Sequence, residues 1–148
     1  MFNFEKSMKL DFLHNFKGGK MSYYFSKVLD LSFDKAIDKA TEELKKEGFG
    51  ILTEIDVKAT MKKKLDIDYP NYMILGSCNP PFAHKALQAE PLIGTMLPCN
   101  VIVREIKDGQ VEVAAVDPIA SMQSIQNPSL GEIAQEVQGK LKKVIGSL

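Results

Sequence analysis

The dipeptide Asp108-Gly109 is the feature that most constrains what this chain can fold into. It favours a two-residue type I′ turn, and it is flanked by residues 101–106 and 111–117, which are rich in β-branched side chains. The two runs therefore predict an antiparallel β-hairpin. Apolar side chains occupy alternate positions on both of its faces, so the hairpin needs a cover on each side. Helices packed on one side of a sheet supply only one of these covers.

The same turn predicts how the two strands pair. With the dipeptide as the loop, Ile106 faces Val111, and the neighbouring pairs follow in steps of one residue. This register puts Glu105 opposite Glu112, on the same face as four apolar side chains that require the second cover. These four residues are Val101, Val103, Ala114 and Val116.

The remaining apolar spacing predicts further strands and helices in one mixed domain. Ser32 offers an N-cap for an amphipathic helix that ends before Gly48, and Asn127-Pro128 begins a long C-terminal helix. We expect further strands at 22–29, 49–57 and 72–75, and short helices at 59–65 and from Pro80 to about Leu87. The sequence thus predicts a single α+β domain over residues 21–148, with about five mainly antiparallel strands and with helices packed on one face.

Residues 1–20 differ from the rest of the chain. Met8, Phe12, Leu13 and Phe16 have helical spacing, and two glycines then break the pattern. Charged residues interrupt the apolar run, which argues against a secretory signal. We expect this segment to be a leader, a tag or an N-terminal arm that docks on the domain or on a partner.

Charge and cysteine content narrow the class of protein. Nineteen basic residues balance nineteen acidic ones, which removes the bulk attraction on which most nucleic-acid-binding proteins rely. Two cysteines are too few for a secreted disulfide scaffold, and no apolar stretch approaches the roughly 20 residues that span a bilayer. No dinucleotide fingerprint, P-loop, nucleophile elbow or zincin motif occurs. We expect a cytoplasmic protein that binds neither nucleic acid nor membranes.

Both cysteines are expected at one end of the sheet. Cys78 follows a strand and precedes a short helix, whose N–H groups and dipole would stabilise a thiolate, while Cys99 precedes the next strand. If these strands are antiparallel neighbours, the end of one lies beside the start of the other, and the hairpin brings Asp117 to the same edge. The expected ligand-binding set is Cys78, Asn79, His84, Cys99 and Asp117.

Three interpretations of this cluster stay open. The two cysteines can be small hydrophobic residues that fill the end of the core. They can instead be catalytic or redox-active thiols, with Cys78 as nucleophile and Cys99 as resolving sulfur. Together with His84 and Asp117 they would also make a chemically sensible zinc set, although neither belongs to a C-x-x-C pair. No other cofactor is expected.

Four stretches carry a resemblance to a known family. The segments GFGILTEIDVKATMKKKL (48–65), YMILGSCNPPFAHKAL (72–87), LIGTMLPCNVIVRE (92–105) and VEVAAVDP (111–118) resemble the bacterial and archaeal family called domain of unknown function 302. The resemblance runs from about residue 21 to residue 148 and includes both cysteine contexts.

The resemblance implies a curved antiparallel sheet, similar in topology to the TATA-binding-protein-like fold, and a homodimer. The homodimer agrees with the need for a second cover, so we expect the dimer interface at Val101, Val103, Ala114 and Val116. It brings no reaction, cofactor or catalytic residue, and function resides in sites rather than in folds. Our first hypothesis is a homodimeric module that binds a small ligand at the edge formed by Cys78, Cys99 and Asp117. The alternatives are a thiol-dependent redox enzyme or sensor, and a purely structural interaction domain. Whether the protein is an enzyme at all stays open at this point.

Overall fold

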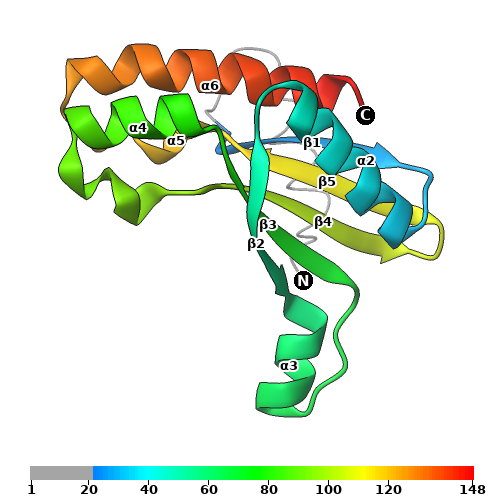
Figure 1. Ribbon diagram of the computed structural model, residues 1–148. Helices are drawn as coiled ribbons and strands as arrows, with labels where there is room; N and C mark the ends of the chain where they lie inside the picture. Colours follow the sequence, from blue (N-terminus) through cyan, green and yellow to red (C-terminus); the bar gives the residue numbers. More distant parts are fainter. Residues whose placement is uncertain (1–21) are drawn as a thin grey trace, which may run out of the picture.

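The computed structural model describes residues 22–148, so the expectations for residues 1–20 lie outside the described residues (Figure 1). Five strands form one antiparallel sheet in the order β1-β5-β4-β3-β2. Their bounds are Tyr24–Leu29 (β1), Gly50–Asp56 (β2), Tyr72–Cys78 (β3), Cys99–Lys107 (β4) and Gln110–Val116 (β5). The predicted α+β class and the strand number are confirmed.

Helices connect the strands and form the second layer. They are α2 (Phe33–Lys46), α3 (Val57–Leu65), α4 (Pro80–Ala89), α5 (Pro118–Ser121) and α6 (Pro128–Gly146), with a 3₁₀ helix, η1, at Pro91–Met96. Local chemistry explains where the two long helices begin. The Ser32 side chain accepts a hydrogen bond from the backbone N–H of Lys35, and Asn127 caps α6 in the same way ahead of Pro128.

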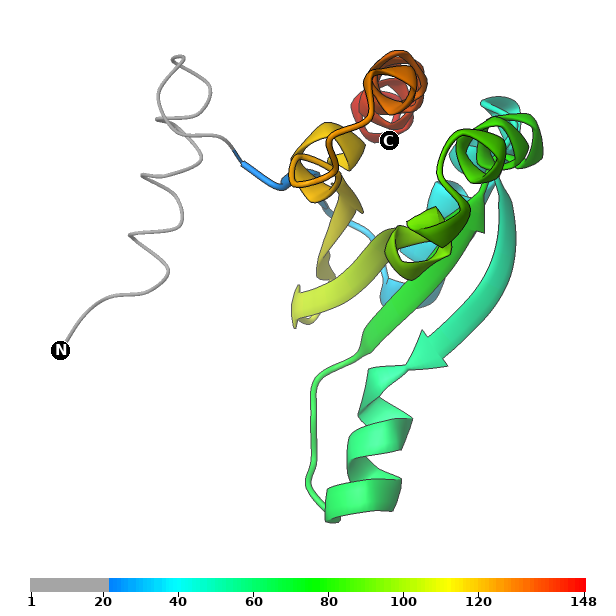
Figure 2. The same cartoon turned by 90° about the vertical axis from the view of Figure 1, so that its left-hand side faces the viewer.

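The helices cover only one face of the sheet. Helices α2, α4 and α6 lie on one face of the sheet, as Figures 1 and 2 show from two directions. The short helix α3 instead projects away from the body, beyond the ends of β2 and β3, which are its main contacts. Within residues 22–148 no helix crosses the centre of the opposite sheet face, which we call the open face.

The core lies between the sheet and the helices. Alternate residues of β4 and β5 supply its sheet side, and the apolar stripes of α2 and α6 supply its helix side. The fully buried apolar sheet residues are Leu75, Val101, Val103, Val111, Val113 and Ala115. Since every second residue of a strand faces the same way, this set fixes which side chains point to the open face.

The predicted pairing of the hairpin was wrong by one residue. The turn lies at Asp108-Gly109 as predicted, with Lys107 paired to Gln110 around it, but it is not of type I′, because only Gly109 and not Asp108 has the positive φ that this type requires at both central residues. The register also shifts between Glu105 and Lys107. Ile106 is the extra residue of a bulge, and beyond it Arg104 pairs with Glu112 and Val103 with Val113. The charged side chains on the two strands favour this shift. The bulge replaces a carboxylate facing a carboxylate by an ion pair in which Arg104 Nε donates to Glu112 Oε1 at 2.8 Å.

The shift sorts the hairpin into one buried face and one open face. Val101 and Val103 have no exposed surface and lie under the helices, so they are not available to a partner. Ala114 and Val116 remain on the open face, together with Ile102, and all three are half-buried. The residue set expected to need a second cover therefore divides between the two faces.

No helix in residues 22–148 has both the length and the apolar character that crossing a membrane requires.

Candidate functional site

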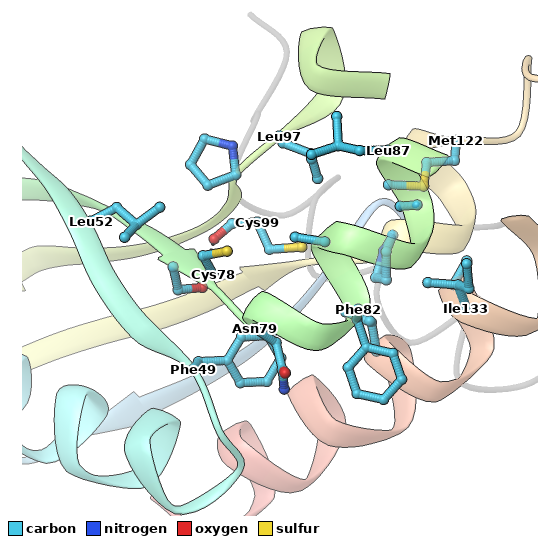
Figure 3. A pocket seen from close by; sticks show the side chains of 17 residues that line it. Phe49, Leu52, Cys78, Asn79, Phe82, Leu87, Leu97, Cys99, Met122 and Ile133 are labelled. Atoms are coloured by element: carbon cyan, nitrogen blue, oxygen red, sulfur yellow. Dashed lines mark hydrogen bonds between the residues drawn. The ribbon is translucent and has the colours of Figure 1, made fainter. Parts of the chain in front are cut away.

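A cavity of about 300 Å³ lies at the end of the sheet where β3 ends and β4 begins. Helices α4, α5 and α6 line its other side and leave it partly open to solvent, and Figure 3 shows the side chains of the seventeen residues that line it. Almost all of them are apolar. The lining consists of Phe49, Leu52, Ser77, Cys78, Asn79, Phe82, Ala83, Ala86, Leu87, Leu97, Pro98, Cys99, Pro118, Met122, Ile133, Ala134 and Val137.

Small side chains on the facing helices leave this space unfilled. Ala83 and Ala86 on α4 and Ala134 on α6 line the cavity at positions where longer side chains would occupy it. Protein interiors are otherwise close-packed, with few voids larger than a water molecule. A cavity of this volume is therefore large enough for a small organic molecule.

The two thiols share this cavity and are not bonded to each other. The strand pairing that brings them together is the predicted one, with β3 and β4 antiparallel and Ser77 opposite Cys99. Ser77 Oγ donates to the Cys99 carbonyl at 2.7 Å, which ties the two strand ends together. Burial, and secondarily the nearby Cys78, raises the pKa of the Cys99 thiol to about 11. Cys99 is therefore held as the neutral thiol at neutral pH.

Asn79 places an amide in the lining, where only 9% of its surface is exposed. Its Nδ2 donates to the carbonyl of Glu47 at 3.1 Å, so it links α4 to the end of α2 rather than capping α4. Pro80 and Pro81 then occupy the first two positions of the helix and have no N–H groups. These two positions offer no donor to the Cys78 thiol, contrary to the expectation that the N–H groups of this helix end would stabilise a thiolate.

Asp117 and His84 do not line the cavity. Asp117 is 7% exposed, and its Oδ1 accepts hydrogen bonds from the Ile119 N–H at 3.0 Å and from Gln138 Nε2 at 3.1 Å. The first bond caps α5 and the second fixes α6, so this carboxylate is structural. His84 lies exposed on α4. In the part of the chain that the structure describes, no three His, Cys, Asp or Glu side chains are grouped as a metal site, and the expected zinc set is not brought together.

Several lining residues were not identified as site residues from the sequence. Ile133, Ala134 and Val137 belong to the apolar stripe of the C-terminal helix, which predicts core packing and gives no separate signal for a cavity. Met122 follows a four-residue helix that the sequence did not predict. The alanines of α4 and α6 were the available signal, since small residues on facing helices leave space.

A second hollow of about 530 Å³ lies on the open face. The ion pair between Arg104 and Glu112 crosses it, and tyrosines border it. Burial, and secondarily Tyr69, raises the pKa of the Tyr72 hydroxyl. Its lining consists of Tyr23, Tyr24, Tyr72, Asn100, Ile102, Arg104, Glu112, Ala114, Ala115 and Val116.

Comparisons with known proteins place the chain in a family. The family model described as "Domain of unknown function DUF302" matches residues 25–148. A crystal structure of an uncharacterized conserved DUF302 protein from Bacillus stearothermophilus superposes with a TM-score of 0.78 at 26% sequence identity. The match covers 85% of this chain and 98% of that one. A search of curated proteins gave no significant match. The chain belongs to the family of domain of unknown function 302.

Proposed function

We propose that this domain binds a small apolar molecule in the cavity beside Cys78 and Cys99. One observation carries the proposal: about 300 Å³ of space is walled almost entirely by apolar side chains in an otherwise close-packed core. When an apolar ligand packs against such a lining, the lining atoms gain dispersion contacts and lose their contact with water. Both effects favour binding.

The lining favours an uncharged part of the ligand inside the cavity. No Asp, Glu, Lys, Arg or His side chain lines it, and the Ser77 hydroxyl already donates to a backbone carbonyl. Burying an unpaired charge here would cost several kcal/mol at the order-of-magnitude level. The thiols and the Asn79 side chain are then the groups that can meet a polar atom of the ligand.

The thiol-enzyme alternative fits this geometry less well. A resolving or attacking sulfur reacts as the thiolate, and burial raises the pKa of Cys99 to about 11. The reactive form of Cys99 is therefore scarce at neutral pH. We accordingly propose that Cys99 contacts the ligand and does not take part in thiol chemistry.

Partly filling the cavity should weaken binding while the fold survives. Ala83→Leu adds three carbons inside the cavity on a helix that tolerates leucine well. Isothermal titration with 1-butanol, 1-hexanol and 1-octanol should show affinity rising roughly fourfold per methylene for the wild type. The Ala83→Leu variant should bind 1-octanol at least about tenfold more weakly.

His84→Leu is the matched control, because it adds an apolar side chain at the next position of the same helix, where residue 84 is exposed and outside the lining. It should bind 1-octanol like the wild type. Equal binding by all three proteins, or no dependence on chain length in the wild type, would exclude the cavity as the site.

We also propose that the open face is the interface of a homodimer. A specific observation favours this second candidate: Ile102, Ala114 and Val116 are half-buried on a sheet face that has no helix over its centre in residues 22–148. An antiparallel sheet can face water on one side, but then polar side chains alternate with apolar ones. Here the polar residues of these two strands are Asn100 and the pair Arg104 and Glu112, which neutralise each other as an ion pair, and they adjoin the apolar Ile102, Ala114 and Val116.

Val116→Asp should convert the dimer to a monomer, because it places a carboxylate on this proposed interface at the end of β5. Light scattering after gel filtration would report the mass. Gln135→Glu adds the same charge on an exposed position of α6, on the opposite layer, and should leave the mass unchanged. A Val116→Asp protein that keeps the wild-type mass, whether monomer or dimer, would reject the proposed interface.

A further inference from the structure

The apolar cavity has two cations beside one of its walls. Lys85 Nζ lies 5.7 Å and Lys140 Nζ lies 5.9 Å from the centre of the Phe82 ring, which itself lines the cavity. The two lysines come from different helices, α4 and α6, that converge on this ring. Distances of up to about 6 Å are those at which an ammonium group is attracted to an aromatic face.

Neither lysine forms an ion pair with a carboxylate within the described residues. The ion pairs there use Lys46, Lys62, Arg104 and Lys143. Lys85 and Lys140 therefore bring two positive charges to one end of a cavity whose own lining is uncharged. Lys140 is half-buried, which weakens its screening by solvent relative to a fully exposed lysine.

We infer that the ligand is an amphipathic anion, an unbranched medium-length carboxylic acid. Its chain would occupy the cavity, and its carboxylate would lie outside the apolar lining, near Phe82, where Lys85 and Lys140 attract it. This inference rests on the proposed function, because it assigns the chemistry of the molecule that fills the same cavity. It agrees with the lining, since an anionic group is excluded from the cavity and is favoured only where the lysines are.

Three ligands with the same chain test this directly: octanoate, 1-octanol and octylamine. Isothermal titration at low ionic strength should give at least about tenfold tighter binding for octanoate than for 1-octanol, and the weakest binding for octylamine. Raising the salt concentration should weaken octanoate binding and leave 1-octanol binding unchanged.

Lysine variants identify where the carboxylate lies. Lys85→Met and Lys140→Met keep an unbranched side chain on the Phe82 ring and remove the charge, so the double variant should bind octanoate no better than 1-octanol. Lys142→Met is the matched control, because Lys142 lies on the same helix with its Nζ 5.2 Å from the ring centre of Phe25, which is outside the cavity lining. It should behave as the wild type.

The outcomes separate the two proposals. Three results would overturn the inference and leave the apolar cavity as a binding site. They are 1-octanol binding as tightly as octanoate or more tightly, octylamine binding more tightly than octanoate, and octanoate affinity that is unchanged in the double lysine variant. Failure of all three ligands to bind would overturn the proposed function as well.

Discussion

Val103→Asp should leave the protein unfolded at room temperature. Val103 has no exposed surface and lies among the fully buried valines of β4 and β5, under α2. The aspartate would be buried as an unpaired charge or as a carboxyl group without hydrogen-bond partners. Either costs several kcal/mol in addition to the lost apolar contacts, out of a total stability of about 5–15 kcal/mol for a domain. Far-ultraviolet circular dichroism and urea titration would measure the loss.

The experiment decides the register of the hairpin. Without the bulge, Val103 would share a face with Ala114, on the side away from Val113, and an aspartate there would be tolerated. With the bulge, Val103 pairs with Val113 in the core. Ile106→Asp is the control, since Ile106 is the bulged residue and is 38% exposed. It should change the free energy of unfolding by about 1 kcal/mol or less. A folded Val103→Asp protein with normal stability would refute the pairing.

The same bulge shows how far the sequence could predict the fold. Local signals were sufficient where one residue acts on its own neighbours: Ser32 and Asn127 cap helices, and the turn forms at Asp108-Gly109 with a positive φ at the glycine, although not as the predicted type I′. The register depended on interactions across strands: the bulge pairs Arg104 with Glu112 and places Val103 beside Val113 on the buried face. Periodicity within one strand does not show how two strands pair.

The candidate site was predictable to the extent that strand pairing determines it. Antiparallel neighbours bring Cys78, Asn79 and Cys99 to one end of the sheet, as expected. Asp117 reaches that edge too, but its carboxylate caps α5 and accepts from Gln138, and that helix was not apparent in the sequence. Whether the His84 side chain faces the cavity depends on the rotation of α4 about its axis, which is determined by the packing of this helix. The cavity itself results from small side chains on neighbouring helices, so no single residue of the sequence predicts it.

Cys99 should be alkylated far more slowly in the native protein than in the unfolded chain. At pH 8 a thiol with a pKa of about 11 is thiolate in roughly one molecule in a thousand, against about one in four for an unperturbed thiol. A thiolate of higher pKa is more nucleophilic, which recovers part of this difference, and burial adds a barrier to access. The net expectation is a rate lower by about ten- to a hundredfold.

The pH dependence of the alkylation rate distinguishes a raised pKa of Cys99 from steric protection of its thiol alone. Because folding raises the pKa, the native rate should keep rising about tenfold per pH unit beyond pH 9, where the unfolded chain has already levelled off. Peptide mass spectrometry of the Cys78→Ala variant with iodoacetamide would isolate Cys99, and the same protein in urea gives the reference. A native Cys99 that labels at the unfolded rate at pH 8 would mean that its thiolate is accessible, and the redox alternative would then account for the site better than a ligand contact. Slow labelling with the extended pH dependence identifies a thiol held neutral by its apolar surroundings, which is the state that a contact with an uncharged hydrocarbon chain requires.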